Sequence, residues 1–333
     1  MATSDEAAQL EPQARNALAQ YELPEPLKVE LLTFSENAVF RAEFDSHEPV
    51  VVRLHSIGYH TETAVRSELK WVEALKKDTD ILVPEIMYTP SGKSVIVATS
   101  PTFPPRYAAV FGMLPGTSPS SENYVADYRV LGHTTAQLHL HAASWTPPPD
   151  FDRFSWNLEG AFGVAPIWGS WRDGPGIGAK EISTLCAAED LIRRRLIEYG
   201  QSPTRYGLIH ADLRLPNILI DSGTVYVIDF DDCGFGWFLY DLAGALTFIE
   251  DDHQAPQMMA SWLEGYTQVR ALDEQDLAII PSLIMMRRMV ILAWLGSRPG
   301  TPVWREEGPK YAKVTARMAN VYLDSLATLV LPA

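Results

Sequence analysis

The chain has 333 residues, a length that predicts one large domain or two lobes and excludes a small scaffold stapled by disulfides. Hydrophobic residues make up 47% of it, the ordinary usage of a globular protein rather than a disordered one. With 27 basic and 42 acidic residues the net charge is −15, so no broad basic face for nucleic acid or anionic lipid is expected.

The candidate for a membrane span is the apolar stretch over residues 277–295. Pro281 and the pair Arg287-Arg288 interrupt it, so we expect it not to cross a bilayer. The acidic N-terminal segment lacks the features of a secretory signal. Cys186 and Cys233 stand far apart without CxxC spacing; both are expected to be buried, and they favour a reducing compartment. These features predict a cytoplasmic protein without membrane or nucleic-acid partners, and they leave its oligomeric state open.

The first third of the chain predicts a small sheet with accompanying helices. Apolar residues at helical spacing over residues 7–21 predict one amphipathic helix. Polar breaks then separate short β-prone runs that predict an antiparallel meander, followed by one helix over residues 61–77. The strands are expected at residues 29–32, 38–44, 49–54, 85–89, 94–98 and from 108 onward. A Gly/Pro connector at residues 112–116 predicts the end of this lobe at residue 111.

The rest of the chain predicts a mainly helical lobe over residues 112–333. Helices are expected over residues 124–143, 182–200, 239–250, 256–270, 273–297 and 310–329. The two parts together predict an α+β protein, with an antiparallel-sheet lobe at residues 1–111 and a helical lobe after it.

Polar residues that a core strand does not need occupy residues 207–232. Within them, the apolar runs 218–220 and 225–228 flank Asp-Ser-Gly and predict a β-hairpin. Asn217 enters the first strand and Asp229 leaves the second, so we expect the two side by side at the open end of the hairpin. An amide oxygen and a carboxylate are suitable ligands for Mg²⁺, and Asp212 lies just upstream. The arrangement is typical of phosphoryl transfer.

The pattern His-x-Asp-x-x-x-x-Asn from His210 to Asn217, followed by Ile-Asp-Phe-Asp at 228–231, carries a resemblance. It resembles the motifs of the aminoglycoside phosphotransferase and choline kinase superfamily, whose members share the protein-kinase-like fold. The most similar branch holds homoserine kinase, hydroxylysine kinase and bacterial stress-response Ser/Thr kinases. The resemblance implies a bilobal fold in which residues 1–111 bind nucleotide and residues 112–333 carry the catalytic loop and the acceptor site.

The resemblance also implies roles for individual residues of the helical lobe. Asp212 would be the catalytic base that orients the acceptor hydroxyl, and Asn217 and Asp229 would bind Mg²⁺. His210 would brace the catalytic loop, and Asp241 would brace it from the following helix.

In the first lobe the resemblance implies that Ser35 and Asn37 belong to a nucleotide loop, that Arg53 contacts phosphate and that Glu68 is its helix carboxylate. ATP and Mg²⁺ are the implied cofactors. The family commonly has lysine where Arg53 stands; arginine keeps the charge and can pair in a bidentate way with phosphate. The loop around Ser35 contains no glycine, so it is not a Gly-rich loop of the protein-kinase type.

We therefore expect an ATP-dependent kinase that transfers the γ-phosphoryl group to a hydroxyl of a small molecule, such as an amino alcohol, a hydroxy amino acid or an aminoglycoside. One alternative is a stress-response Ser/Thr protein kinase. The short interval from Asp229 to Asp241 leaves no room for a long peptide-binding activation segment. Another is a catalytically silent nucleotide-binding regulator, against which the joint presence of Asp212, Asn217 and Asp229 argues.

Three further features suggest simpler interpretations. His139 and His141 lie two apart in a predicted helix and point away from each other, so we interpret them as structural rather than metal-binding. The Gly/Pro run at residues 169–178 lacks the pattern of a phosphate loop and predicts a surface loop, either near the acceptor or without a role. Asp231 and Asp232 are candidates for touching the water of a metal or the acceptor, or for capping a turn.

Overall fold

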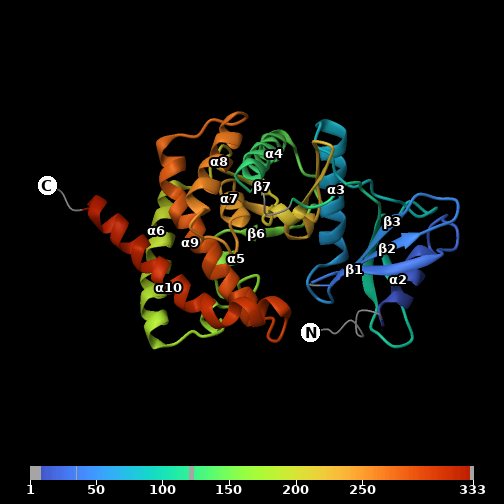
Figure 1. Cartoon of the computed structure of the whole chain (residues 1–333), viewed down its shortest axis with the longest axis horizontal. Helices are drawn as coiled ribbons and strands as arrows, with labels where there is room; N and C mark the ends of the chain where they lie inside the picture. The colour runs from blue at the N-terminus through green and yellow to red at the C-terminus, as the bar shows by residue number, and fades with distance from the viewer. Residues whose placement is uncertain (1–8, 35, 120–123, 331–333) are drawn as a thin grey trace. The chain divides into compact units, whose positions relative to one another are not determined.

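The structure is a computed structural model that describes residues 9–34, 36–119 and 124–330. It divides the chain into two compact units, each assembled from several stretches of sequence (Figure 1). Unit 1 consists of Met1–Thr117, Pro147–Arg153 and Leu219–Asp231, and unit 2 of Ser118–Thr146, Phe154–Ile218 and Asp232–Ala333. The functional boundary at residue 112 stays a prediction.

Unit 1 contains a five-stranded antiparallel sheet with the order β1-β2-β3-β5-β4. The strands are β1 (Lys28–Phe34), β2 (Ala38–Glu43), β3 (Val50–Leu54), β4 (Ile96–Ala98) and β5 (Arg106–Gly112). The predicted meander is therefore confirmed. The strand expected at residues 85–89 is wrong, because this segment forms only an isolated bridge from Ile86 to Phe111. Pro84 and Pro90 flank it and lack the N–H groups that a longer ladder needs.

Alternation along the strands divides the sheet of unit 1 into two faces. Phe40, Val50 and Val52 belong to the hydrophobic core that also includes the apolar face of α2 (Glu11–Leu18). Arg53 follows Val52, so its side chain leaves the strand on the opposite face. There it meets Glu68 of α3 (Glu62–Asp78).

The predicted hairpin is present as β8 (Ile218–Asp221) and β9 (Thr224–Val227). Ser222 and Gly223 join the strands with φ of 50° and 85°. A two-residue turn with both central φ angles positive matches the right-handed twist of paired strands, and glycine at its second position adopts that conformation without steric cost.

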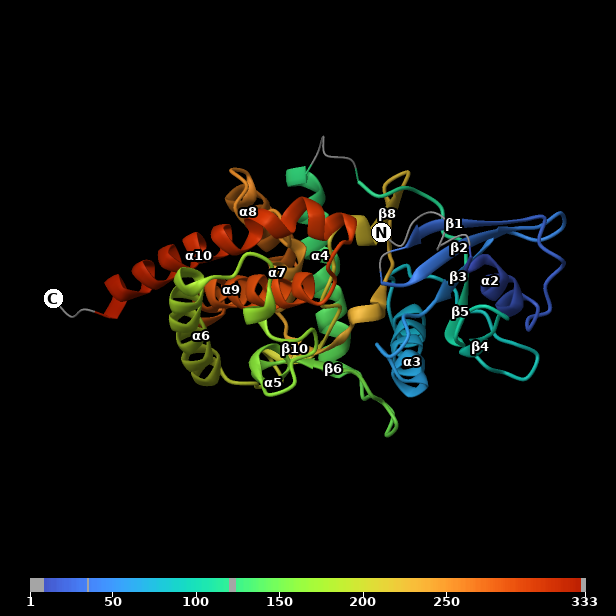
Figure 2. The ribbon, with the colours of Figure 1, turned by 90° about the horizontal axis from the view of Figure 1, so that it is seen from below.

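Unit 2 combines a three-stranded sheet with helices (Figure 2). Its strands, in the order β6-β10-β7, are β6 (Phe154–Trp156), β10 (Gly234–Trp237) and β7 (Tyr206–Ile209). Its helices are α4 (Tyr124–Ser144), α5 (Leu158–Phe162), α6 (Ala179–Tyr199), α7 (Tyr240–Ala245), α8 (Ala255–Thr267), α9 (Glu274–Gly296) and α10 (Pro302–Val330). The α+β class is confirmed.

Two predicted helix boundaries are wrong by five residues or more. The helix expected over residues 239–250 ends at Ala245, and Phe248 beyond it has a φ of 72°, which a helix does not tolerate. The helix expected to begin at residue 310 begins at Pro302 instead. Proline is favoured in the first turn because its missing N–H has no partner there in any case.

Helix α9 packs against α6, α7 and α10 within unit 2 (Figure 1). By length and composition alone it could cross a membrane, but 72% of its apolar window is buried inside the protein. Such burial is typical of the core helix of a globular unit. The interrupting pair, Arg287 and Arg288, is buried with the rest.

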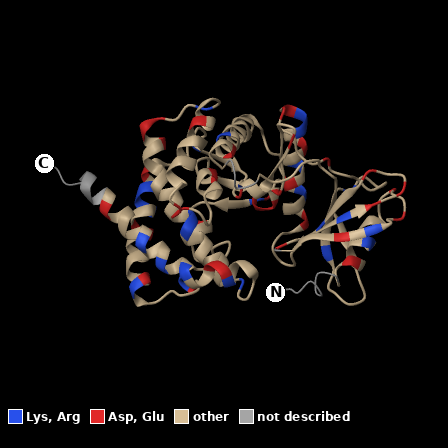
Figure 3. Cartoon of the chain, viewed as in Figure 1, with Lys and Arg blue, Asp and Glu red and all other residues tan. Residues whose placement is uncertain are grey.

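Charged residues are spread over both units, and only one of the two cysteines is buried. Figure 3 shows acidic and basic positions interspersed on the ribbons of both units, so the acidic excess is not collected in one segment. Cys233 is buried as expected. Cys186 is partly exposed, contrary to expectation, and accepts a hydrogen bond from Arg172 at its Sγ atom.

Helices α4 and α8 approach each other closely because each presents a glycine to the other's backbone. A Cβ atom at Gly132 would lie 2.0 Å from the carbonyl oxygen of Trp262, and one at Gly265 would lie 1.9 Å from that of Arg129. These carbonyl oxygens belong to the backbone, so they cannot avoid an added Cβ atom by a change of side-chain rotamer. The pair therefore holds α4 and α8 at a separation that no larger residue permits.

We expect Gly132→Ala to lower the free energy of unfolding by about 1–3 kcal/mol, since the added methyl group forces the helices apart. Chemical denaturation measures the effect. Gly112→Ala is the control, because a Cβ atom there would lie 3.6 Å from the Cβ of Glu85, an ordinary contact. Equal losses in both variants would contradict this account of the helix pair.

Candidate functional site

The loop that follows β7 in unit 2, the predicted catalytic loop, is held through its backbone by one buried carboxylate. His210 and Ala211 follow β7, and Ala211 has a φ of 68°. The N–H of Ala211 donates to Asp241 Oδ1 at 2.7 Å, and that of His210 donates to Oδ2 at 3.1 Å. Asp241 lies in the first turn of α7 and is fully buried. It has the bracing position expected from the sequence.

His139 of α4 supports Asp241 in turn. Its Nε2 lies 2.9 Å from Asp241 Oδ2, and its Nδ1 lies 3.0 Å from the hydroxyl of Tyr266 on α8. Burial lowers the pKa of His139 despite the neighbouring carboxylate, so the ring is neutral. A neutral ring donates from Nε2 to Asp241 and accepts from Tyr266 at Nδ1. The interpretation of His139 as structural holds, but the sequence did not reveal its connection, through Asp241, to the loop that carries Asp212.

Asp212 is surrounded by donors from unit 2. Its Oδ1 accepts from Arg287 Nη2 at 2.7 Å and from Arg214 Nε at 3.1 Å. Its Oδ2 accepts from Asn217 Nδ2 at 3.1 Å and from Arg214 Nε at 3.3 Å. The side chain keeps 17% of its surface exposed, so the oriented carboxylate is open to a reactant.

Asn217 is oriented by the same loop. Its Nδ2 also donates to the backbone oxygen of Asp212, at 2.8 Å. With the nitrogen engaged by Asp212, the Oδ1 atom is the one left to bind a cation. Mg²⁺ prefers such oxygen ligands, so Asn217 fits the metal-binding role implied for it.

Unit 1 brings together the other predicted residues that carry charge. Arg53 Nη2 lies 2.6 Å from Glu68 Oε1, and Arg53 Nη1 lies 3.9 Å from Asp229 Oδ1. The side chains of Arg53 and Glu68 are only 8% and 2% exposed. Burial alone would lower the pKa of Arg53, but the carboxylates of Glu68, Asp231 and Asp229 raise it above its usual value. Arg53 is therefore a permanent buried cation.

These residues fit a nucleotide with its metal. Arg53 Nε and Glu68 Oε2 are buried without a hydrogen-bond partner among the described residues, so each still has capacity for a polar ligand. Asp229, by contrast, is 51% exposed and has a φ of 63°. An exposed carboxylate beside a buried guanidinium suits a divalent cation and a phosphate.

The predicted nucleotide loop is only partly described. Ser35 lies outside the described residues. Asn37 is buried, and its Oδ1 accepts from the backbone N–H of Ser56 at 3.0 Å. The Ser56 hydroxyl donates to the carbonyl oxygen of Glu36. These bonds tie the loop to the residues after β3, and a contact of Asn37 with nucleotide remains a prediction.

Asp231 has the role of an internal anchor within unit 1. Its Oδ1 lies 3.3 Å from His55 Nδ1 and 3.5 Å from His60 Nε2, while Arg153 donates to its backbone oxygen. Burial would raise the pKa of Asp231, but His55, His60 and Arg53 hold it well below its usual range. The sequence suggested Asp231 as a possible neighbour of the metal and gave no sign of either histidine partner.

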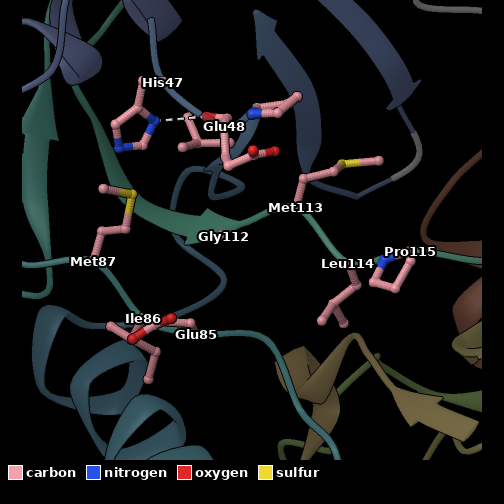
Figure 4. A pocket seen from close by; sticks show the side chains of 11 residues that line it. His47, Glu48, Glu85, Ile86, Met87, Gly112, Met113, Leu114 and Pro115 are labelled. Carbon is pink, nitrogen blue, oxygen red and sulfur yellow. Dashed lines mark hydrogen bonds between the residues drawn. The ribbon is translucent and has the colours of Figure 1, made fainter.

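A groove of about 740 Å³ opens in unit 1 where β3 begins and β5 ends (Figure 4). Figure 4 shows Met87 and Met113 on opposite sides of the view, and His47 beside Glu48. None of the predicted site residues that the structure describes lines it. It is therefore distinct from the polar cluster around Arg53.

Comparison with known proteins agrees with this chemistry. The model of the phosphotransferase enzyme family (APH) matches residues 31–272. The amicoumacin kinase of Bacillus subtilis is 25% identical over 280 residues, 80% of each chain. A homoserine kinase of Neisseria meningitidis is 28% identical over 156 residues, which cover 45% of this chain and 47% of that protein.

Among solved structures, a microcompartment-associated aminopropanol kinase superimposes with a TM-score of 0.86 and 41% sequence identity. The match covers 94% of this chain and 97% of that one. Each of these relatives is named as a kinase of a small molecule, as expected from the residues around Asp212. The chain is accordingly an ATP-dependent kinase of small molecules and belongs to the phosphotransferase enzyme family.

Proposed function

We propose that the chain phosphorylates the hydroxyl group of a small amino alcohol in the cytoplasm, with ATP as donor and Mg²⁺ as metal. The observation that carries the proposal is the environment of Asp212, a partly exposed carboxylate oriented by Asn217 and two arginines. The similarity to an aminopropanol kinase over 94% of the chain supports the choice of acceptor class.

In the proposed reaction Asp212 orients the acceptor hydroxyl and receives its proton. The hydroxyl oxygen forms the new bond to the γ-phosphorus, the bond from phosphorus to the bridging oxygen of ADP breaks, and the proton passes to the carboxylate. Asn217 and Arg214 already donate to Oδ2, at 3.1 Å and 3.3 Å, so the hydroxyl approaches the part of the carboxylate that is still exposed.

Arg53 offsets negative charge on the phosphates, and Glu68 keeps the guanidinium in place. Asn217 and Asp229 are the residues proposed to hold Mg²⁺. When bound, the metal neutralises charge on the phosphate oxygens. Most of the rate enhancement then comes from positioning and electrostatics, because the protein forms no covalent bond.

Aromatic rings of unit 2 lie beside one of the arginines that bind Asp212. Phe248, Trp294 and Trp168 form a connected cluster, with ring centroids 6.3 Å and 6.4 Å apart in succession. Arg287, which binds Asp212, lies over the Trp168 ring at 5.4 Å. Arg298 lies over Trp168 at 5.8 Å and over Trp294 at 4.9 Å, so guanidinium groups already occupy these rings. The choice of an amino alcohol therefore rests on the similarity to the aminopropanol kinase.

The substrate class is tested by mass-spectrometric detection of phosphorylated product with ATP and Mg²⁺. The acceptors are aminopropanol, ethanolamine, choline, homoserine, an aminoglycoside, amicoumacin and a generic protein. We expect phosphorylated amino alcohol at the highest kcat/KM. A preference for the antibiotics or homoserine would overturn the amino alcohol assignment, and label on protein alone would favour a protein kinase.

We expect Asp212→Ala to lower kcat by about 10²–10⁴-fold, the usual contribution of a general base, and to leave ATP binding by calorimetry intact. Asp221→Ala is the matched control, because Asp221 is an exposed carboxylate at the hairpin turn. Normal turnover in Asp212→Ala would show that this residue is not the base.

A double variant separates the structural and functional roles of Arg53 and Glu68. Glu68→Met should cost about 3–5 kcal/mol of stability, because it leaves the buried Arg53 uncompensated. Arg53→Met combined with Glu68→Met should recover part of that loss but retain a raised KM for ATP. Denaturation and steady-state kinetics measure the two effects. A double variant with an unchanged KM for ATP would contradict the phosphate-binding role.

A further inference from the structure

Helix α9 carries a buried cation, Arg287, that the proposed reaction does not use directly. The residue is 1% exposed. Its Nη2 donates to Asp212 Oδ1 at 2.7 Å, and its Nε donates to Thr247 Oγ1 at 3.0 Å. The guanidinium also lies over the ring of Tyr240, at 5.7 Å. Residues far apart in the sequence therefore hold this one group in place.

The neighbouring Arg288 shows what a structural arginine on the same helix looks like. It is also 1% exposed, and its Nη1 lies 2.6 Å from Glu250 Oε2. The side chains of this pair are 2% and 1% exposed, so both charges belong to the interior. Arg287 differs because the carboxylate that it binds, Asp212, is 17% exposed. Arg288 therefore pairs with a buried carboxylate of the core, whereas Arg287 binds the proposed base, Asp212.

The contacts of Arg287 restrict how the carboxylate of Asp212 can turn. Rotation about its terminal bond would separate Oδ1 from Arg287 and Oδ2 from Asn217 at the same time. Arg214 adds a third donor, but its side chain is 29% exposed and therefore less constrained. The hydroxyl of Thr247 accepts from Arg287 Nε and so fixes the orientation of the guanidinium plane. A planar group with donors on two edges suits this task, and an ammonium group does not.

We infer that Arg287 is a positioning residue for phosphoryl transfer, which holds the carboxylate of Asp212 in the orientation that receives the acceptor hydroxyl. The inference rests on the proposed role of Asp212 as the base. Arg287 acts on the reaction only through Asp212. Its removal therefore affects turnover more than the binding of ATP or acceptor.

Arg287→Lys and Arg288→Lys make the same chemical change at adjacent, equally buried positions, so they form a matched pair. We expect Arg287→Lys to lower kcat by about 10-fold to 100-fold, as a misplaced catalytic group does, with both KM values nearly unchanged. Arg288→Lys should lower thermal stability by a similar amount and keep kcat. Arg287→Lys should have little further effect in an Asp212→Asn background, because the group on which it acts is already altered.

The experiment distinguishes an error in the role of Arg287 from an error in the role of Asp212. Equal kcat in the two lysine variants, or a loss in Arg287→Lys that persists fully in the Asp212→Asn background, would overturn the positioning role of Arg287. Normal turnover in Asp212→Asn itself would overturn the role of Asp212 as base, whatever Arg287 does. Melting curves of each variant confirm that the kinetics come from folded protein.

Discussion

The buried carboxylate of Asp241 is the constraint on which the loop that carries Asp212 depends. It accepts from two successive backbone N–H groups, at a point where Ala211 takes a conformation that costs a non-glycine residue about 1–3 kcal/mol. Two hydrogen bonds to a charged acceptor, each worth about 1.5–3 kcal/mol, offset that cost. Without Asp241 the loop would relax and carry Asp212 away from its present orientation.

Backbone strain is concentrated in one part of the chain. Among the described residues, the non-glycine positions with positive φ are Ala211, Ser222, Asp229 and Phe248. Ala211 precedes the proposed base, Asp229 is itself a proposed metal ligand, and Ser222 shapes the hairpin that joins these two segments. Strain of this kind persists only where the surrounding contacts determine the backbone fully, as His139 and Asp241 do here.

Local patterns predicted much of the fold, and long-range contacts account for what they missed. The hairpin was readable because the residues that specify it, Asp221, Ser222 and Gly223, are adjacent in sequence. Roles for Asp212 and Asn217 were readable because the spacing of their motif fixes a loop. Arg287 was not: it lies 75 positions from Asp212, and the sequence shows it only as a charge that interrupts an apolar helix. Similarly, no short pattern links His139 to Asp241, which lies 102 positions away.

The division into units has a consequence for how the protein can be dissected. The chain passes between the units five times, after residues 117, 146, 153, 218 and 231. A fragment that ends at residue 111 would therefore lack Arg153 and Asp231, which complete the interior of unit 1 around His60. Neither unit corresponds to a continuous piece of the gene. Truncation at a single residue, or exchange of one continuous segment with a relative, would therefore divide the core of a unit. An insertion at the exposed hairpin tip, at Ser222 and Gly223, would interrupt none of the five crossings between the units.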